Sequence, residues 1–368
     1  MAGGVERVLT LKANYFADVL GYDITIVLTD GKGKPHFFPL SEKVKVINLD
    51  INYEELWSCG FVRKIWLYLR KQPVYRRKLK ALLMQIRPDI TISLLRREIN
   101  FITSIKDGSQ KVGELHINRE HFRTEESQNP SVVKVLFARL WVKALVPKLQ
   151  RLDCLVVLTE NDRKAWHELT NVVAIPNPLS LTVSALSPLS EKRVISVGRY
   201  CHEKGYDSLL KMWAELQHLN SEWRLDAYGD GDKSAYEAMI DELRIDRSRC
   251  ALHGRTADVQ REYARSSIAV CSSNYEGFGM VLVEAMACGL PVVSFDCPWG
   301  PRNIITNGDD GLLVPNGDTH QLALALSSLM SRPEELSRMS SNAVVNVRRF
   351  DIAEVARRWQ CLFDDLLN

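Results

Sequence analysis

Residues 274–291, in the carboxyl-terminal half of the chain, hold the densest set of groups that could do chemistry. Gly277 and Gly279 lack a Cβ and so let the main chain approach a ligand closely, directly before an apolar helix predicted over residues 280–288. Gly289 and Pro291 end that helix. The free N–H groups and the positive dipole end at its start are suited to an anion such as a phosphate.

Two carboxylates frame the start of this helix. Glu276 lies in the loop before the helix and Glu284 lies one turn inside it. Carboxylates repel a diphosphate, so their natural partners are the neutral hydroxyl groups of a sugar ring or a ribose. Acidic residues also favour helix amino termini for structural reasons, and that explanation would serve for Glu284 alone. The whole string favours a ligand site instead.

A second group of charged residues lies in the string of residues 196–205. Arg199 and Lys204 flank a predicted turn between a strand and a helix, and ligands bind at such carboxyl ends of strands in open α/β sheets. Two cations there could neutralise a leaving diphosphate, which arginine can grip through two parallel hydrogen bonds. Taken alone, the pair is also compatible with solvated loop cations.

A third string resembles a metal site or a dinucleotide fingerprint at first sight. Asp230 and Asp232 have the Asp-x-Asp spacing of metal-dependent sites, but they follow a predicted strand, in a turn where Gly and Asp are expected anyway. Gly229 and Gly231 lack the third glycine that a dinucleotide fingerprint requires. We therefore predict no metal here and do not favour a nicotinamide-dependent oxidoreductase.

Short β-rich runs alternate along the chain with stretches of helical periodicity, and these elements must position the charged groups. Strands are predicted over residues 23–28, 44–49, 89–94, 111–115, 153–158, 172–175, 193–197, 223–228, 250–253, 268–272, 291–295 and 312–314. In the first half, helices are predicted over residues 5–20, 62–71, 74–86 and 132–150. The alternation predicts an α/β fold with parallel sheets covered on both faces.

The length of 368 residues fits two domains. The Pro- and Ser-containing stretch 177–191 predicts a linker, so we expect two doubly wound Rossmann-like domains, residues 1–178 and 179–350, with a cleft between them. Residues 351–368 predict a separate amphipathic helix packing back toward the first domain. Because Gly3 and Gly4 lead straight into a helix, we expect the first strand to be missing, through either a start-site boundary or a shortened fold.

The composition is that of an ordinary globular protein, with 46% hydrophobic and 25% charged residues. It excludes a disordered chain, a collagen-like repeat and a coiled coil. No run approaches the ~18 apolar residues of a membrane span, and no signal-peptide pattern opens the chain. The eight cysteines form no Cys-x-x-Cys pair. They favour free thiols in a reducing cytoplasm.

The net charge of +3 conceals a difference between the two halves. Residues 1–180 hold 28 Lys and Arg against 19 Asp and Glu, whereas the remainder holds 20 against 26. From Arg63 to Arg97 there are eleven basic residues against the single acid Asp89, with apolar residues interleaved. Such a segment suits an anionic membrane surface, although solvated helix faces would give the same pattern. Nothing in it resembles a module that reads nucleic acid.

Together these strings resemble the retaining glycosyltransferases of family 4 (glycosyl transferases group 1), which have the two-domain GT-B fold. The likeness covers nearly the whole chain. The strings that carry it are Gly3-Gly4-Val5-Glu6-Arg7, Ile175-Pro-Asn-Pro178, residues 197–205, Tyr228-Gly-Asp-Gly231, His253-Gly254, Glu276-x7-Glu284 and Gly311-Leu-Leu-Val-Pro315.

The resemblance implies roles for the charged residues at matching positions. It implies that Arg199 and Lys204 hold the diphosphate of a sugar-nucleotide donor. It also implies that Glu276 faces the hydroxyls of the donor sugar, and that Glu284 binds the ribose. His116, at the end of a predicted strand, matches the histidine of the acceptor-side domain that faces the donor sugar.

The resemblance implies further contacts made largely through the main chain. The residues concerned are Gly277, Phe278, Gly279 and Met280 along the sugar and phosphates, Arg255 beside the base, and Gly3 and Gly4 with His116 on the acceptor side. The implied catalytic set is Arg199, Lys204, Glu276 and His116.

The implied reaction moves a hexose or N-acetylhexosamine from a nucleotide-diphosphate sugar, with a UDP-sugar favoured. The acceptor would be a glycan or a lipid-linked molecule in surface polysaccharide synthesis, and the enzyme would be cytoplasmic or peripheral on the membrane. No metal or cofactor is implied. The sequence offers no obvious nucleophile opposite the leaving group. Family members are thought to retain configuration by front-face substitution, in which the departing phosphate oxygen accepts the acceptor's proton.

The sequence also departs from the family. Arg302 and Asn303 stand where many members carry a Gly-Gly turn and a nearby glutamate, so the preferred donor sugar cannot be copied. A catalytically impaired sugar-nucleotide-binding or partner protein is the main alternative to an enzyme. A sugar-nucleotide epimerase would need acid/base groups in the cleft beyond those that the sequence supplies.

Overall fold

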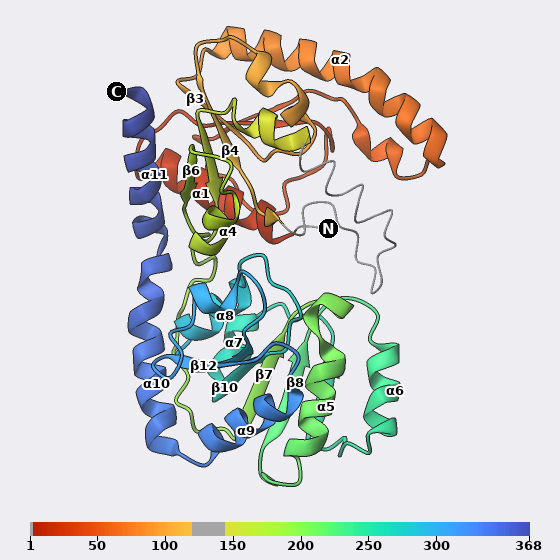
Figure 1. Ribbon diagram of the computed structural model, residues 1–368, viewed down its shortest axis with the longest axis vertical. Helices are drawn as coiled ribbons and strands as arrows, with labels where there is room; N and C mark the ends of the chain where they lie inside the picture. The colour runs from red at the N-terminus through yellow and green to blue at the C-terminus, as the bar shows by residue number, and fades with distance from the viewer. Residues whose placement is uncertain (1–2, 120–143) are drawn as a thin grey trace.

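The computed structural model describes residues 3–119 and 144–368, which fold into two α/β halves, one above the other in Figure 1. The carboxyl-terminal half is built on six strands whose pairings are all parallel, in the order β12-β11-β10-β7-β8-β9. These strands are β7 (Arg193–Val197), β8 (Arg224–Tyr228), β9 (Cys250–His253), β10 (Ile268–Cys271), β11 (Val292–Phe295) and β12 (Gly311–Val314). The strand order reverses between β7 and β10, and ligands bind at the carboxyl ends of strands at such a point.

Helices cover both faces of this sheet because neighbouring strand residues point to opposite sides. In β7, Val194 belongs to the core under α5 (Tyr206–Leu216), α6 (Ser234–Glu242) and α9 (Thr319–Met330). The next residue, Ile195, belongs to the core under α7 (Val259–Ala264) and α8 (Met280–Ala287). The helix α10 (Pro333–Asn346) contributes to both cores.

The sheet of the amino-terminal half is in two pieces, again with parallel pairing. One piece pairs β1 (Thr25–Leu28) with β2 (Lys45–Asn48). The other has the order β3 (Ile90–Ser93), β4 (Gln110–Glu114), β5 (Cys154–Val157) and β6 (Val172–Ala174). No strand among residues 3–119 and 144–368 joins β1 to β3, although Asp30 and Arg97, just beyond the ends of these strands, form an ion pair at 3.6 Å.

The helix α1 (Gly4–Asp18) bridges the two pieces on one face. Its Ala13 and Ala17 pack with Ile26 of β1, whereas its Phe16 packs with Val112 of β4. On the other face one core contains residues following both pieces, such as Leu49 and Leu95. The two pieces therefore form one layer, and the short α4 (Glu160–Ala165) lies between β5 and β6 in the chain.

The basic segment differs from its prediction. Instead of two helices over residues 62–71 and 74–86, one helix, α2 (Phe61–Ile86), runs through Pro73. Pro73 removes the hydrogen bond that an N–H there would give to the carbonyl of residue 69, and its ring crowds that carbonyl. Leu69 is 62% exposed, so water can reach this stretch of the helix and satisfy that carbonyl. The prediction of a break at Pro73 was wrong.

The last helix returns from the carboxyl-terminal half to the amino-terminal half (Figure 1). It is α11 (Ile352–Leu367), and its Phe363 ring lies 5.9 Å from that of Phe16 in α1. Single 3-10 turns complete the described chain at Tyr53–Leu56, Glu98–Asn100, Ile102–Ser104, His202–Lys204, Pro301–Asn303 and Val347–Phe350.

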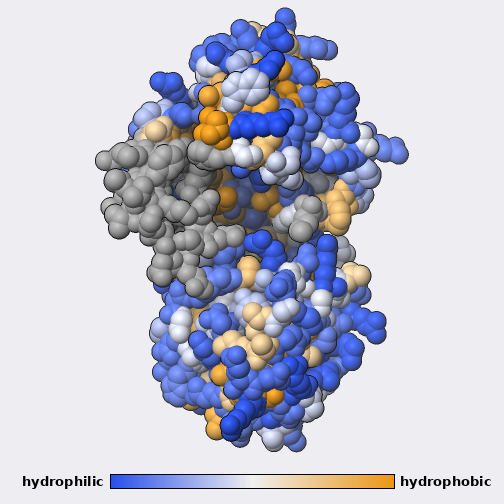
Figure 2. Space-filling model, turned by 90° about the vertical axis from the view of Figure 1, so that its right-hand side faces the viewer, coloured by the Kyte–Doolittle hydropathy of each residue, from blue (hydrophilic) through white to orange (hydrophobic). Residues whose placement is uncertain are grey.

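The predicted fold class is confirmed: the chain is α/β with parallel sheets, and it fits two doubly wound Rossmann-like domains. Most of the helix predicted over residues 132–150 lies outside the described residues, and residues 144–149 are helical. No helix in the part of the chain that the structure describes is long and apolar enough to cross a membrane. The surface is hollowed between the two halves (Figure 2).

Candidate functional site

The start of α8 lies at the point where the strand order of the six-stranded sheet reverses, between β7 and β10. Its N-cap residue Gly279 has a φ of +100°, a left-handed conformation that favours glycine, and an added Cβ would lie 2.9 Å from the side chain of Leu282. The first turn of α8 contains no acidic residue. Its N–H groups are therefore available to an anion, as the sequence predicts.

An ion pair joins the two predicted strings beside this helix start. The Nζ atom of Lys204 donates to Oε1 of Glu276 at 2.6 Å, and the hydroxyl of Ser273 donates to the same oxygen at 2.7 Å. The turn that carries Lys204 packs tightly on the end of β10, since a Cβ at Gly205 would lie 2.0 Å from the carbonyl oxygen of Ser272. Close packing of the two loops therefore brings the cation to the carboxylate.

Both members of this pair are well shielded from water. The side chain of Lys204 is 20% exposed and that of Glu276 is 7% exposed. Burial lowers the pKa of Lys204, but the Glu276 carboxylate outweighs burial and raises the pKa above its usual value. Lys204 therefore stays charged at neutral pH.

Arg199 is at the same edge of the sheet but is not part of this pair. It follows β7, its side chain is 66% exposed, and its Nη2 donates to Glu203 at 3.3 Å. The structure therefore brings Lys204 and Glu276 together, whereas the second predicted cation faces the solvent.

Glu284 lies inside α8 and is met from the other half of the molecule. Its Oε1 accepts from Nη1 of Arg7 at 3.2 Å and from the hydroxyl of Ser180 at 3.0 Å, while Nη2 of Arg7 donates to the carbonyl of Ser180 at 2.6 Å. Burial raises the pKa of Glu284, and Arg7 and Ser180 lower it, with a net rise. The surroundings as a whole therefore disfavour the charged carboxylate, and Arg7 and Ser180 offset part of that effect.

His116 lies at the end of β4, on the amino-terminal half, and its main chain lies close to the loop that precedes α8. A Cβ added to Gly277 would lie 3.4 Å from the carbonyl oxygen of His116. The His116 ring is 8% exposed, with Nε2 at 3.2 Å from Oε1 of Glu114 and with a buried Nδ1 that has no partner among the described residues. One ring nitrogen is thus held by Glu114, and the other is buried without a hydrogen-bond partner among the described residues.

Glu114 is itself a buried carboxylate with two basic neighbours. Lys12 of α1 pairs with it, and the Lys12 ammonium also lies 4.6 Å from the ring centre of Trp359 in α11. Burial raises the pKa of Glu114, but Lys12 and His116 outweigh burial and bring it to about 2. The charge of Glu114 thus depends on α1, and its position fixes the ring of His116.

The other predicted donor-side residues are more varied in their surroundings. Phe278 is buried against Phe350, with ring centres 5.6 Å apart, so only its main chain is available to a ligand. Met280 is half-buried at the start of α8. Arg255 is exposed after β9 and lies 5.6 Å from the ring centre of Phe37, which belongs to the amino-terminal half.

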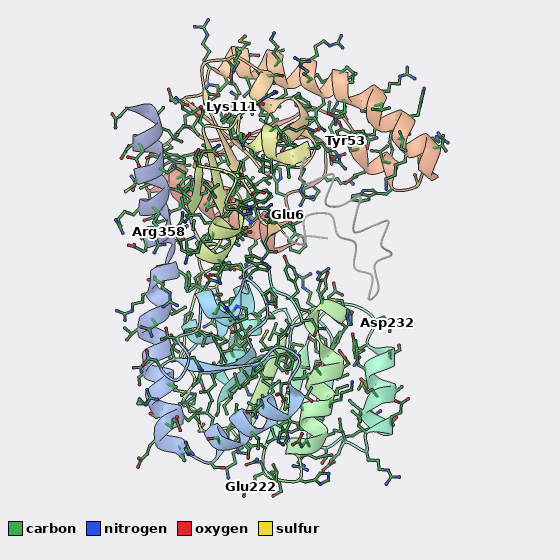
Figure 3. The ribbon with its side chains drawn as sticks, viewed as in Figure 1. Glu6, Tyr53, Lys111, Glu222, Asp232 and Arg358 are labelled. Carbon is green, nitrogen blue, oxygen red and sulfur yellow. The ribbon has the colours of Figure 1, made fainter. Side chains whose placement is uncertain are left out.

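The two predicted acceptor-side glycines begin α1. The N–H of Gly3 donates to Glu6 at 2.9 Å, and a Cβ added to Gly4 would meet no atom within 4 Å. Figure 3 shows Glu6 on the side of the amino-terminal half that faces the other half. The start of α1 is therefore open toward the space between the halves.

The two carboxylates of the Asp-x-Asp string accept hydrogen bonds from residues of the same turn. Asp230 accepts from the N–H of Gly231 at 3.0 Å, and Asp232 accepts from the N–H and the hydroxyl of Ser234 at 2.9 and 2.6 Å. The described residues contain no group of three or more His, Cys, Asp or Glu side chains placed to hold a metal ion.

Several residues of the site could not be found from the sequence. They are Arg7 and Ser180 at Glu284, Lys12 and Glu114 behind His116, Ser273 at Glu276, and the hydrogen-bonded pair Asn118 and Tyr275 across the two halves. Arg7 lies in the opening string Gly3-Gly4-Val5-Glu6-Arg7 and Tyr275 lies in residues 274–291, but nothing in either string indicates the partner across the two halves.

Comparison with known proteins places this geometry in a family context. Residues 183–344 match the family described as glycosyl transferases group 1. An uncharacterized glycosyltransferase of Haemophilus influenzae is 28% identical over 365 residues, covering 98% of this chain and 96% of that protein. An exopolysaccharide phosphotransferase of Streptomyces coelicolor is 33% identical over 232 residues, which cover 61% of this chain but only 24% of that longer protein.

Solved structures match the chain over almost its full length. A sucrose-phosphate synthase from Thermosynechococcus elongatus has a TM-score of 0.78 at 20% identity, covering 99% of this chain and 94% of that one. A lipopolysaccharide outer core galactosyltransferase has a TM-score of 0.74 at 20% identity, covering 99% and 96%. The chain therefore has the GT-B fold of glycosyltransferases, and its carboxyl-terminal half matches the glycosyl transferases group 1 family.

Proposed function

We propose that the chain is a retaining glycosyltransferase of family 4 that uses a nucleotide-diphosphate sugar, with a UDP-sugar favoured. The sugar would be a hexose or N-acetylhexosamine, moved to a glycan or lipid-linked acceptor in surface polysaccharide synthesis. The observation that carries the proposal is the shielded Lys204–Glu276 pair beside the free amino terminus of α8. A cation, a helix start and a carboxylate suit the diphosphate and the hydroxyls of one donor molecule.

The Lys204–Glu276 ion pair also suggests how the donor binds. Without donor, Lys204 and Glu276 neutralise each other at 2.6 Å. A diphosphate carries more negative charge than one carboxylate, so it would draw Lys204 to itself and release Glu276 to accept from a sugar hydroxyl. Arg199, exposed at the same edge, is free to swing onto the phosphates. With these cations the reaction needs no metal and no cofactor to stabilise the leaving diphosphate.

The remaining residues complete the donor and acceptor sides. Glu284 would accept from the ribose, and the main chain of Arg255 would lie along the base. His116 would offer its unpartnered Nδ1 to the donor sugar from the acceptor side. In a front-face reaction the leaving phosphate oxygen takes the acceptor's proton, so catalysis would consist of positioning and charge stabilisation.

The names of related proteins agree with this substrate class. One relative is a poly(glycerol-phosphate) alpha-glucosyltransferase of Bacillus subtilis, 21% identical over 316 residues and 44% covered by this chain. An Anabaena protein solved with UDP-glucose has a TM-score of 0.71 at 17% identity. Both names describe those proteins, and they support a UDP-sugar and a surface polymer as the first substrates to test.

The test is a donor-hydrolysis and transfer screen over UDP-, GDP- and ADP-sugars. Lys204→Ala or Arg199→Ala should lower turnover at least about a hundredfold, because each removes a charge that offsets the leaving diphosphate. Lys192→Ala is the matched control, since Lys192 pairs with Glu222 at an exposed place on the same half. Near-native turnover in Lys204→Ala would contradict the assignment.

The alternative is a sugar-nucleotide-binding protein with impaired catalysis. The amino-terminal sheet in two pieces is the observation that favours it, because the acceptor side would then lack a strand of support. Binding of a UDP-sugar without hydrolysis or transfer, across a panel of acceptors, would favour this alternative over the enzyme.

A further inference from the structure

We propose that Arg7 is a positioning residue of the donor site: together with Ser180, this side chain of the acceptor half holds the Glu284 carboxylate oriented for the donor ribose. The inference rests on the proposed function, which gives Glu284 to the ribose. It adds that recognition of the nucleoside depends on contact between the two halves of the molecule.

The two side-chain donors around Glu284 both contact the same carboxylate oxygen, Oε1. Arg7 and Ser180 both donate to Oε1, at 3.2 and 3.0 Å, and Arg7 is itself fixed by the carbonyl of Ser180 at 2.6 Å. No hydrogen bond from a side chain in the described part of the chain reaches Oε2. The contacts therefore fix the rotation of the carboxylate and leave one oxygen to accept from a ligand hydroxyl.

Arg7 also supplies charge at a place where little other charge is present. The Glu284 side chain is 8% exposed, and the titratable groups that face it are Arg7, Tyr263 and Cys288. Burial raises the pKa of the Tyr263 hydroxyl well above its usual value and that of the Cys288 thiol to about 12, so both are neutral at physiological pH. Among the described residues, Arg7 is thus the cation that offsets part of the effect of burial on the pKa of Glu284.

The partners of Glu284 belong to separate parts of the chain. Arg7 is in the first turn of α1, 277 residues away, and Ser180 is in the segment between the two halves. If the halves move apart, Arg7 leaves and Glu284 loses a donor that fixes the rotation of its carboxylate. Opening would therefore weaken the hold on the ribose and favour release of the nucleotide.

The experiment compares UDP with 2′-deoxy-UDP by calorimetry at pH 6 and pH 8. The wild type should prefer UDP by about tenfold at both values, which is the size of one hydrogen bond to a charged group. Arg7→Met should lose most of this preference, and the loss should be larger at pH 6 than at pH 8, because Arg7 lowers the pKa of a carboxylate whose pKa burial raises. Arg7→Lys should keep it at both values, because the charge is retained.

Two further variants separate positioning from folding. Arg357→Met removes an exposed ion pair with Glu354 on α11 and should leave the preference for UDP unchanged. Ser180→Ala removes one donor to the same oxygen without touching Arg7, and it should reduce the preference at pH 6 about threefold. Melting curves without ligand establish that each variant is folded.

The outcomes distinguish this inference from the proposed function. If the wild type binds none of UDP, GDP and ADP, the proposed function fails and this inference falls with it. If the wild type prefers UDP and folded Arg7→Met prefers it equally at pH 6, the positioning role of Arg7 is wrong although the donor site stands. A loss of preference that is the same at both pH values in Arg7→Met and Arg7→Lys would also contradict it.

Discussion

At the residue scale, the buried carboxylate of Glu114 makes the stability of the chain depend on a single cation. Glu114 has a side chain that is 3% exposed, and its charge is balanced by Lys12 and faced by His116. Removing one partner of a buried pair leaves an uncompensated charge, which costs far more than the pair contributes as a whole. Lys12, on the first helix, thus controls the stability of a group next to the candidate site.

We predict that Lys12→Met lowers the free energy of unfolding by about 3–5 kcal/mol at pH 7, measured by urea unfolding. The pKa of Glu114 is about 2, below its usual 4.5, so the stability from its charged form is complete above about pH 4.5 and is lost as the pH falls toward 2. The deficit of Lys12→Met should therefore shrink in acid.

Two variants check the cause of this loss. Lys45→Met breaks the exposed pair with Asp23 and should cost no more than about 1 kcal/mol. The double variant Lys12→Met, Glu114→Gln removes both charges and should recover part of the lost stability. Equal losses in Lys12→Met and Lys45→Met would show that the buried pair is not the cause.

Some residues of the candidate site could be predicted from the sequence, whereas contacts between distant parts of the chain could not. Lys204 and Glu276 were predictable as site residues because each follows a strand at the reversal of the sheet, where side-chain type and local glycines carry the signal. Arg7 and Glu284 are 277 residues apart, and their contact depends on how two halves pack together. No local pattern encodes that packing, so neither this pair nor Lys12 with Glu114 was predicted.

At the element scale, α2 is the segment that departs most from a core helix. Its first two turns expose Val62, Ile65, Trp66 and Leu69, by 80, 45, 56 and 62%, at the spacing of a single helix face. Arg63, Lys64 and Arg70 are among them, and α2 extends beyond the rest of its half in Figure 1. Its second half differs, because Tyr75, Leu79 and Leu83 are buried in the core.

We predict that this face of α2 binds anionic vesicles, because apolar and basic side chains are exposed together in its first turns. The protein should float with vesicles that contain about 30% phosphatidylglycerol at low salt and much less at 1 M salt, because screening removes the attraction of the cations. Trp66→Gln with Leu69→Gln should reduce flotation at least about threefold.

The matched control for α2 is Leu324→Gln, an exposed leucine on α9 of the other half, 43% exposed. It should float like the wild type. Flotation that is indifferent to anionic lipid, or that is unchanged in the Trp66 and Leu69 variant, would mean that the exposed face of α2 serves another purpose.

At the scale of the whole molecule, the two halves are not independent. Contacts between them reach the candidate site at Arg7–Glu284, at His116 beside Gly277 and at Asn118–Tyr275. The last helix of the chain also packs on the first half, where its Trp359 ring lies 4.6 Å from the Lys12 ammonium. The alternation of strands and helices predicted both sheets, but the sequence alone could not show that one half supplies charge to the carboxylate of the other.

The returning helix α11 should therefore stabilise the half that it reaches, not the half that precedes it in sequence. Its Trp359, 1% exposed, joins a core with Phe16 of α1, Val112 of β4 and Val156 of β5. Trp359→Ala should cost about 3–5 kcal/mol in that half. Hydrogen exchange should show lost protection in α1, β4 and β5 while β7 and β10 stay protected.

Leu367→Ala, at the exposed end of the same helix, is the matched control and should change stability by less than about 0.5 kcal/mol. If Trp359→Ala instead loosened β7 and β10 as much as β4 and β5, the chain would unfold as one unit. Selective loosening of the first half would mean that the carboxyl-terminal half can stay folded while α1, which carries Arg7, loses its support.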